Sequence, residues 1–394
     1  GINGSVATFQ NGESNLAMLI GVTLVNGSGT LHGWIFGGGI FCYYASPVLS
    51  YLIIRDNYAF EYGGGIACHY GSSPIIDHVT IENNEAGYFG GGIHCEGADS
   101  PVILNSVIRG NIADAGSGIS VWSNSTSLVV ENTLLCENTG SRCIYNEGGN
   151  SSYTLVNVTI TNNENGALQL SQGGYATIVN SVLWGNPPNE IAISSPPGPN
   201  SVVITYSDIS GGLEGIQGNL GDTVAWLDGN IDLDPLFRDA EASDYRLSVG
   251  SPCIDAGTYF FEWEGETIID LSPDEYIGQA PDMGAFESGA TTNIEADGSL
   301  PGRFVLQQNH PNPFNPQTTI HYELPKQTTV TLRIFDLAGR LVDVLVEGEV
   351  QPAGAHTATW NGRDLQGRAM PSGTYFYRLE TGGYTETKRM TLIR

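Results

Sequence analysis

Short runs of alternating apolar and polar residues recur along the first half of the chain. Each run is a few residues long and is bounded by Gly or Asn, which is typical of β-strands and too short for helices. The string GGGI ends at Ile40, Ile66 and Ile93, and GSGI ends at Ile119, so the pattern repeats every 26 or 27 residues. We interpret the glycines before each isoleucine as tight corners between strands.

An apolar stretch that ends in asparagine follows each of these strings. These asparagines are spaced by 23 to 27 residues, at Asn57, Asn84, Asn111, Asn138, Asn163 and Asn186. About eight such units, each too small to bury its own apolar face, must stack on their neighbours. The pattern therefore predicts an all-β fold, with parallel β-helix coils over residues 1–211 and a closing region over 212–290.

Stacked coils turn repeated positions into columns. The asparagines above form one column, and a second column contains Asn105, Asn132, Asn157 and Asn180. An amide at a turn tolerates left-handed backbone geometry and can hydrogen-bond to the amide of the next coil. We interpret both columns as structural ladders rather than catalytic groups.

The pattern changes after residue 290. Residues 291–300 carry no period and are predicted to be a linker. Alternating strands follow, namely TTIHYEL, TVTLRIFD, GRLVDVLV, GAHTATW, GTYFYRLE and TETKRMTLI. So many strands in a short segment predict a small antiparallel Ig-like β-sandwich over 301–394.

Composition separates the same two parts. Residues 1–299 hold 5 basic and 34 acidic side chains, whereas 300–394 hold 10 basic and 8 acidic ones. The overall net charge of −27 argues against nucleic acid as a partner, because phosphate contacts need clustered Lys and Arg. No apolar run is long enough for a membrane span.

One outward column carries the side chains best suited to chemistry. It reads Tyr43, His69, Glu96 and Trp122, and the column two positions earlier holds His94. A histidine beside a carboxylate and flanked by aromatic rings suits a sugar-binding site, or acid–base catalysis by His69, Glu96 and His94. The alternative is a solvated face of mixed composition.

Two further columns are predicted to face outward. Arg55, Glu82 and Arg109 alternate in charge, which offsets like-charge stacking. The aromatic residues before the glycine corner, Phe36, Tyr62 and Phe89, are expected to form an exposed column that either packs the corner or stacks on glycans.

The cysteines fall into three groups. Cys42, Cys68 and Cys95 lie two residues after the repeat isoleucine, so they share its inward face as small hydrophobes. Cys136 and Cys143 flank a six-residue turn and are a candidate disulfide pair for an oxidising compartment, although the sequence leaves open whether they are bonded. Cys253 has no evident partner, and no CxxC pair indicates zinc.

The closing region contains one weak metal motif. Asp228, Asn230, Asp232 and Asp234 are spaced like the start of a calcium loop. The sixth and twelfth positions are Leu233 and Asp239, where such a loop has Gly and Glu. An Asp-rich turn is therefore the favoured interpretation, no cofactor is expected, and Ca²⁺ is the alternative.

The GGGI…NN repeat resembles right-handed parallel β-helix proteins of bacterial surfaces, including the polymorphic outer-membrane type. GNIDLDPLF, DYRLSVGSPCIDAG and PDMGAFE are similar to the region that closes such helices in secreted bacterial proteins. Polysaccharide lyases and hydrolases share this architecture, but their Arg/Lys and calcium cluster is not matched here, which weakens an enzymatic prediction.

The last domain resembles the C-terminal sorting domain of type IX secretion, a relative of the Ig-like domain of flagellar hook-capping proteins. NPFNP, DLAGR, the run from Gly354 through His356 to Trp360, PSGTYFY, and the basic pair Lys388 and Arg389 carry this resemblance. It implies the type IX machinery as a partner, export across an outer membrane, and a domain that relatives often lose after export.

Together these observations predict a secreted or surface-displayed structural protein or adhesin of a Gram-negative-type bacterium. The chain starts within coil-like sequence, so we expect end-to-end stacking of copies into an extracellular filament; a truncated or proteolysed chain would start in the same way. The alternative is a carbohydrate-active enzyme or glycan-binding module that uses the His69 and Glu96 face.

Overall fold

The computed structural model describes residues 4–97, 100–122, 126–147, 149–194, 199–218, 221–273, 275–289, 304–309, 312 and 314–393. The predicted linker 291–300 lies outside these residues. The chain divides into two compact units, the first of residues 1–261 and 271–298 and the second of 262–270 and 299–394. Among the described residues there is no helix that is both long and apolar enough to cross a membrane.

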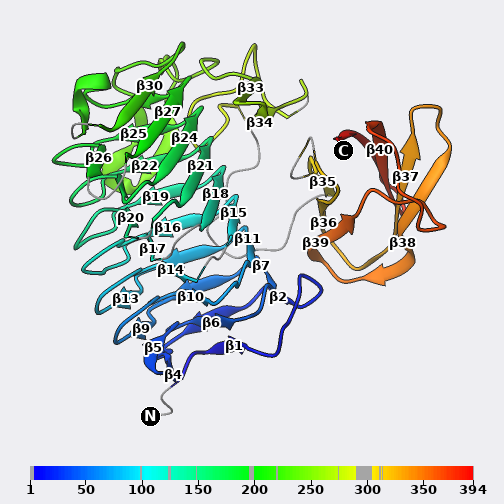
Figure 1. Ribbon diagram of the computed structural model, residues 1–394, viewed down its shortest axis with the longest axis horizontal. Coiled ribbons are helices and arrows are strands. Elements are labelled where there is room, and N and C mark those ends of the chain that lie inside the picture. The colour runs from blue at the N-terminus through cyan, green and yellow to red at the C-terminus, as the bar shows by residue number, and fades with distance from the viewer. Residues whose placement is uncertain are drawn as a thin grey trace. The chain divides into compact units, whose positions relative to one another are not determined.

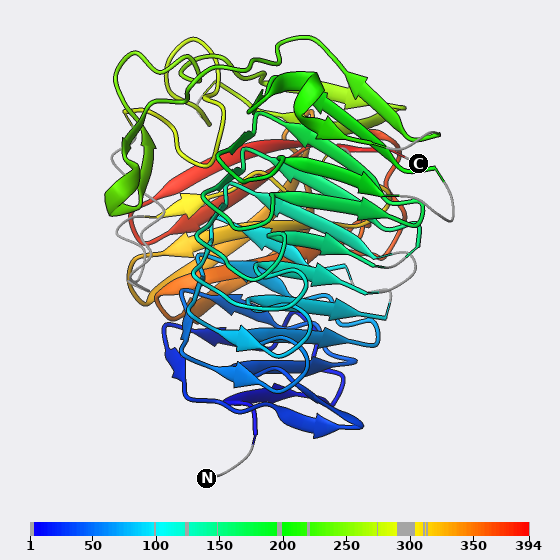
Figure 2. The same cartoon turned by 90° about the vertical axis from the view of Figure 1, so that its left-hand side faces the viewer.

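Three parallel sheets wind the first unit into a β-helix (Figures 1 and 2). Sheet 1 has nine strands, β1 (Ala7–Phe9), β6 (Ile40–Tyr43), β10 (Ile66–His69), β14 (Ile93–Glu96), β17 (Ile119–Val121), β20 (Ile144–Asn146), β23 (Leu168–Ser171), β26 (Ile191–Ser194) and β29 (Ile216–Gln217). Sheet 2 has nine, β2 (Met18–Ile20), β7 (Val48–Ser50), β11 (Ile75–Asp77), β15 (Val102–Leu104), β18 (Ser127–Glu131), β21 (Ser152–Val156), β24 (Tyr175–Val179), β27 (Ser201–Thr205) and β30 (Thr223–Trp226). Sheet 3 has eight, β3 (Thr23–Val25), β8 (Ile53–Arg55), β12 (Thr80–Glu82), β16 (Val107–Arg109), β19 (Leu134–Cys136), β22 (Thr159–Thr161), β25 (Val182–Trp184) and β28 (Asp208–Ile209).

The remaining elements between residues 4 and 289 lie outside these three sheets. They are β4 (Thr30–His32), β5 (Trp34–Phe36), β9 (Tyr58–Ala59), β13 (Glu85–Ala86), β31 (Phe237–Asp239), β32 (Asp244–Leu247), β33 (Phe260–Trp263), β34 (Glu266–Asp270) and two 3₁₀ turns, Gly212–Gly215 and Ala240–Ala242. The last coil includes β29 and β30, so the β-helix continues past residue 211, where the sequence pattern places its end.

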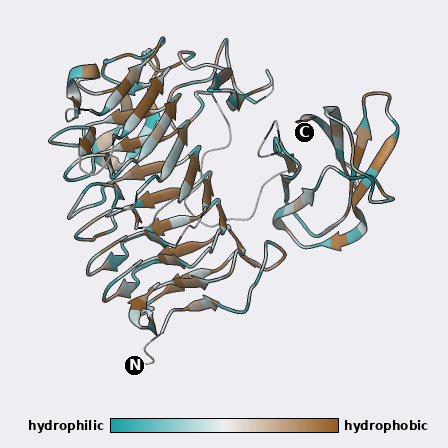
Figure 3. Cartoon of the chain, in the orientation of Figure 1, coloured by the Kyte–Doolittle hydropathy of each residue, from teal (hydrophilic) through white to brown (hydrophobic). Residues whose placement is uncertain are grey.

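The strand register follows the sequence repeat. Ile66 pairs with Ile40 on one side and with Ile93 on the other, and Ile93 pairs with Ile119. These isoleucines are fully buried in one continuous core with Cys42, Cys68 and Cys95. Figure 3 shows hydrophobic residues concentrated along the strands. The predicted fold of about eight stacked coils is confirmed, and the core thiols lie where alternation places them.

The glycine strings make the corners for two separate reasons. Gly63 has φ +67°, a left-handed conformation that other residues adopt at a cost. Gly64 has no such φ, but an added Cβ would lie 2.5 Å from the carbonyl oxygen of Glu85. The first glycine therefore sets the direction of the chain, and the next one lets neighbouring coils approach closely.

The first asparagine column is a buried hydrogen-bonded ladder. Asn111 Oδ1 accepts from the backbone N–H and from Nδ2 of Asn84, while Asn111 Nδ2 donates to Asn138 Oδ1 and to the Ile81 carbonyl. The same set of bonds recurs from coil to coil, and Glu190 accepts both donors of Asn186 where the ladder ends. These amides satisfy backbone groups inside the core, as the structural interpretation predicts.

The asparagines of the second column, unlike those of the first, themselves adopt the left-handed backbone conformation. Asn105, Asn132 and Asn157 have φ between +47° and +50°, and their amides bond from coil to coil. In the first column the residue before the asparagine, such as Asn83 at +54°, takes this conformation instead. Asn180 leaves the second ladder, because its amide bonds to the backbone of Thr258.

The closing region folds back along sheet 3. Its Tyr245 and Ala285 pack on Val107, Leu134 and Cys136, and its Leu247, Cys253 and Met283 pack on Val182. The backbone N–H of Ala285 donates to Thr159 Oγ1, 126 residues away in sequence. This region therefore covers the outer face of sheet 3 in addition to following the last coil.

The second unit contains the predicted antiparallel sandwich. One sheet has β35 (Val305–Leu306), β36 (Thr318–Leu324) and β39 (Gly354–Trp360), and the other has β37 (Thr328–Asp336), β38 (Leu341–Gln351), β40 (Gly373–Thr381) and β41 (Thr385–Leu392). Trp360, Tyr322, Tyr377 and Phe314 are the largest fully buried side chains of its core. The fold class of this part is confirmed.

Candidate functional site

The outer face of sheet 1 holds the side chains that the sequence singled out. In the register of β6, β10 and β14, His69 lies directly between Tyr43 and Glu96. His94 lies two residues before Glu96 on the same face, and Trp122 directly follows β17. The structure therefore places all five predicted residues on adjacent coils.

Aromatic rings from the glycine corners fold over this face. Phe36 stacks on Tyr62 with ring centroids 5.1 Å apart, and Tyr62 stacks on Phe89 at 5.9 Å. Phe36 and Tyr62 are only 1% and 6% exposed, so the expectation of an exposed column is wrong for these two residues. A glycine in the left-handed conformation follows each aromatic residue and changes the direction of the chain. The ring therefore packs against the strand that follows and fills the corner.

Two histidines beneath these rings converge on one carboxylate oxygen. His69 Nδ1 lies 3.3 Å from Glu96 Oε2, and His94 Nε2 lies 3.7 Å from the same atom. His69 stacks on Phe36 and His94 stacks on Tyr62. The other ring nitrogen of His94, Nδ1, is 2.8 Å from Ser120 Oγ.

Burial favours the neutral form of both imidazoles. Loss of solvent lowers the pKa of His94 and of His69, although Glu96 acts in the opposite direction on both. Burial alone would raise the pKa of Glu96, but the neighbouring imidazoles of His94 and His69 together lower it. Glu96 is thus an ionised, partly exposed acceptor at neutral pH.

This arrangement suits binding better than acid–base catalysis. A general acid or base must reach the atom whose proton it transfers, directly or through one water. The side chains of His94 and His69 are 0% and 6% exposed, whereas Glu96 is 30% exposed. The carboxylate is therefore accessible from outside the β-helix, whereas the imidazoles are not.

Exposed aromatic residues next to this site were missed at the sequence level. Tyr44 is 59% exposed and Tyr70 is 47% exposed, and their rings stack with centroids 5.6 Å apart. Tyr70 also contacts the His69 ring, and Trp122, 39% exposed, contacts Phe89. The repeated position after Tyr43 and His69 was the available signal, since both coils have tyrosine there.

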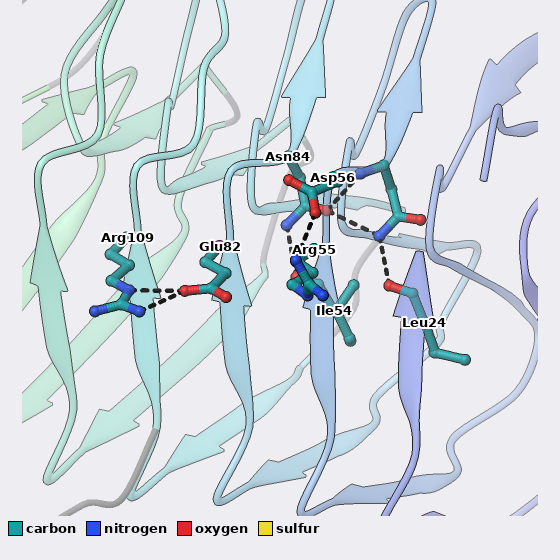
Figure 4. Close-up of polar contacts among 8 residues, drawn as sticks. Leu24, Ile54, Arg55, Asp56, Glu82, Asn84 and Arg109 are labelled. Carbon is teal, nitrogen blue, oxygen red and sulfur yellow. Dashed lines mark hydrogen bonds and ion pairs between the residues drawn. The ribbon is translucent and has the colours of Figure 1, made fainter. Parts of the chain in front are cut away.

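The charged column on sheet 3 is only partly paired. Arg109 donates to Glu82 Oε2 through two nitrogens, at 2.8 and 2.6 Å (Figure 4). Arg55 is in register with Glu82 but bonds to Asp56 instead. This column lies beside the part of sheet 3 that the closing region covers, and Cys136 takes the next place in it.

The candidate disulfide between Cys136 and Cys143 is absent. Cys143 is in the interior of the β-helix beside Asn138, whereas Cys136 lies on the outer face under Tyr245. The strand separates the two thiols even though they are close in sequence, and burial raises the pKa of both. Cys253 lies 3.2 Å from Asp208 Oδ2.

The calcium candidates are used as turn acceptors. Asn230 accepts from the Ser207 backbone N–H and donates to Ile204 and Leu227, and Asp232 accepts from the Gly211 N–H. Asp234 accepts from Leu236, two residues along the chain. Within the described part of the chain, Asp228, Asp232 and Asp234 do not form a group of three whose ligand atoms all lie within 4.8 Å of one another.

Comparisons with known proteins agree with this architecture. Residues 6–183 match the model of the right handed beta helix region, and residues 314–383 match that of the FlgD Ig-like domain. The first unit is a right-handed parallel β-helix. The second contains a small antiparallel β-sheet region that is similar to the FlgD Ig-like domain over residues 314–383.

A solved structure gives a much weaker likeness. It is PorZ, described as an essential bacterial surface component of the type-IX secretion system of Porphyromonas gingivalis. The match has 21% identity and a TM-score of 0.17, and covers 28% of this chain and 13% of that one. Such a TM-score carries no functional argument. No curated protein matches the chain.

Proposed function

We propose that this protein is a secreted or cell-surface adhesive β-helix protein, exported by a type IX-like system through its C-terminal Ig-like domain. The observation that carries the adhesive role is the surface around Glu96, where the rings of Tyr44, Tyr70 and Trp122 are exposed while the imidazoles of His69 and His94 are buried. Exposed aromatic clusters on a rigid scaffold are typical of recognition surfaces.

The export role rests on the second unit. Its sequence carries the motifs that resemble a sorting domain, and its charge balance differs from that of the acidic β-helix. Its Ig-like fold and the FlgD match are consistent with this role. These features support an extracellular or outer-membrane-surface location for the β-helix.

Export is tested with the full chain in a bacterium that has type IX secretion. We expect the full chain, preceded by a secretory leader, in the medium or on the surface, and a chain that ends at residue 290 in the periplasm. A matched variant with Arg55→Ala should be exported normally. Equal export of the chain without the Ig-like domain would contradict this role.

Head-to-tail assembly is the second part of the proposal. Strand β30 ends sheet 2, and within the described residues it pairs with β27 alone. Its Val224, Ala225 and Trp226 are only partly buried, so this edge offers backbone groups and apolar surface to a further coil. Negative-stain microscopy should show filaments that shorten with Val224→Pro, because proline removes a ladder donor. Single particles at every concentration would contradict assembly.

A carbohydrate-active enzyme is the less favoured function. Its candidate groups are His69, Glu96 and His94, and two of these three are inaccessible. Glycan binding without turnover is compatible with the same surface and agrees with an adhesive role.

A further inference from the structure

We infer that the exposed tyrosines directly after strands β6 and β10 and the Glu96 carboxylate form a binding site for an uncharged polysaccharide that runs along the β-helix. This inference deepens the proposed extracellular function and rests on it. The site comprises Tyr43, Tyr44, Tyr70, Glu96 and, at its far end, Trp122.

The backbone at the tyrosine pair is the first argument. Tyr44 and Tyr70 have φ of +51° and +54°, a left-handed conformation that is costly for a bulky side chain. The next coil has Gly97 at this place, with φ +107°. Backbone N–H groups of Tyr44 and Tyr70 bond to the carbonyls of His69 and Glu96, which hold the strained turns in place. Two coils thus keep an exposed tyrosine where glycine is the unstrained choice.

Ring contacts connect this pair to the carboxylate. The centroid of the Tyr43 ring lies 4.7 Å from that of Tyr44 and 5.7 Å from that of Tyr70. The centroids of the Tyr70 and His69 rings are 4.1 Å apart. His69 in turn lies against Glu96 Oε2. Hydrophobic ring edges and faces therefore adjoin one strong hydrogen-bond acceptor, which is the combination that the C–H faces and hydroxyl groups of a sugar require.

Charge selects the class of polysaccharide. The strands of sheet 1 contain no Lys or Arg, and residues 1–299 carry 34 acidic and 5 basic side chains. An acidic polysaccharide would be repelled by Glu96 and by this field. The Glu96 side chain is 30% exposed, so its carboxylate can accept hydrogen bonds from the hydroxyl groups of an uncharged sugar.

Spacing favours a chain along the β-helix axis. Parallel strands repeat every ~4.8 Å, close to the length of one pyranose ring in an extended glycan. Successive sugars would then meet Tyr44, Tyr70 and Glu96 on three successive coils. Binding of soluble oligosaccharides should strengthen with length until the oligomer spans these coils.

The test is retention of the full-length protein on insoluble cellulose, curdlan and mannan, followed by calorimetry with oligosaccharides of the polymer that binds. Tyr44→Gly with Tyr70→Gly should weaken binding by about tenfold or more. The fold is kept because glycine suits the left-handed turns, and an unchanged circular dichroism spectrum and Tm check this. Tyr259→Gly, at an exposed tyrosine of the closing region, is the matched control.

Three results would overturn the inference. They are no retention on any neutral polymer, equal binding by the double glycine variant, and a preference for an acidic polymer such as polygalacturonate. Chitosan tests the amino-sugar class, and binding to it alone would also overturn the inference. Export of the chain is measured separately, so the proposed location can hold when the glycan site fails.

Discussion

At the residue scale, buried polar groups define this β-helix as much as its apolar core does. The asparagine ladder is fully enclosed, and each amide uses both its oxygen and its nitrogen. A buried polar group without partners is costly, so such a ladder is stabilising only when it is complete. We therefore expect the contribution of each asparagine to stability to depend on how deeply its amide is buried.

Removing one member of the buried ladder should be strongly destabilising. Asn111→Ala deletes bonds to Asn84, Ile81 and Asn138 and leaves their groups unsatisfied. We expect the free energy of unfolding in urea to fall by about 2–4 kcal/mol. The control is Asn132→Gly in the part-buried second ladder, which should lose under ~1 kcal/mol. Equal losses would contradict the distinction between the two columns.

The last group of the ladder makes stability depend on pH. Burial raises the pKa of Glu190 from 4.5 to about 7, although hydrogen bonds from Asn186 lower it. Between these values the folded state retains a proton that the unfolded state releases, so this term loses stability as pH rises.

Comparison with Glu190→Gln isolates this effect. The unfolding free energy of the native protein should decrease relative to that of the variant between about pH 4.5 and 7. The difference is measured by denaturant unfolding at several pH values. A constant difference would show that Glu190 ionises normally in the folded protein, and a difference that increases with pH would show that folding lowers its pKa; either result would contradict the prediction.

At the element scale, the corner before each sheet 1 strand sets both the course of the chain and the content of the candidate site. A left-handed glycine directs Phe36 or Tyr62 back over the next strand, where these rings cover His69 and His94. The corner therefore decides which side chains of the site stay exposed.

Alanine at such a corner should be costly. In Gly63→Ala the new Cβ would lie 2.5 Å from the Ile66 carbonyl oxygen in addition to the strain of φ +67°. We expect a loss of about 3 kcal/mol in unfolding free energy. Gly71→Ala is the control, because its φ is similarly positive but no atom lies within 4 Å, and about 1 kcal/mol is expected. Similar losses would mean that crowding contributes nothing.

The elements also show where sequence reasoning succeeds. The repeat predicts the register of Ile40, Ile66 and Ile93, because parallel strands must align equivalent positions. It does not predict that the closing region covers sheet 3, since contacts such as Ala285 with Thr159 join segments 126 residues apart. It also places Cys136 and Cys143 near each other without showing that they lie on opposite faces of a strand.

At the scale of the whole molecule, the chain combines an acidic β-helix with an Ig-like domain of nearly balanced charge. The sequence predicts both folds, and it predicts the column that contains His69 and Glu96. The burial of the histidines could not be predicted, because it depends on how corner rings from other coils fold over them. That burial supports the proposed adhesive function, which the sequence already favoured over catalysis, because it removes two of the three candidate catalytic groups from the surface.

One measurement on the full-length protein distinguishes adhesion from catalysis, with cellulose, curdlan and mannan as the neutral polysaccharides. Protein retained on the polymer and reducing ends released from it are quantified in the same samples, for the native chain and for Glu96→Gln. We predict retention that weakens in the variant, with no release of reducing ends by either protein. Release by the native chain that is lost in Glu96→Gln would contradict the adhesive function and establish a carbohydrate-active enzyme.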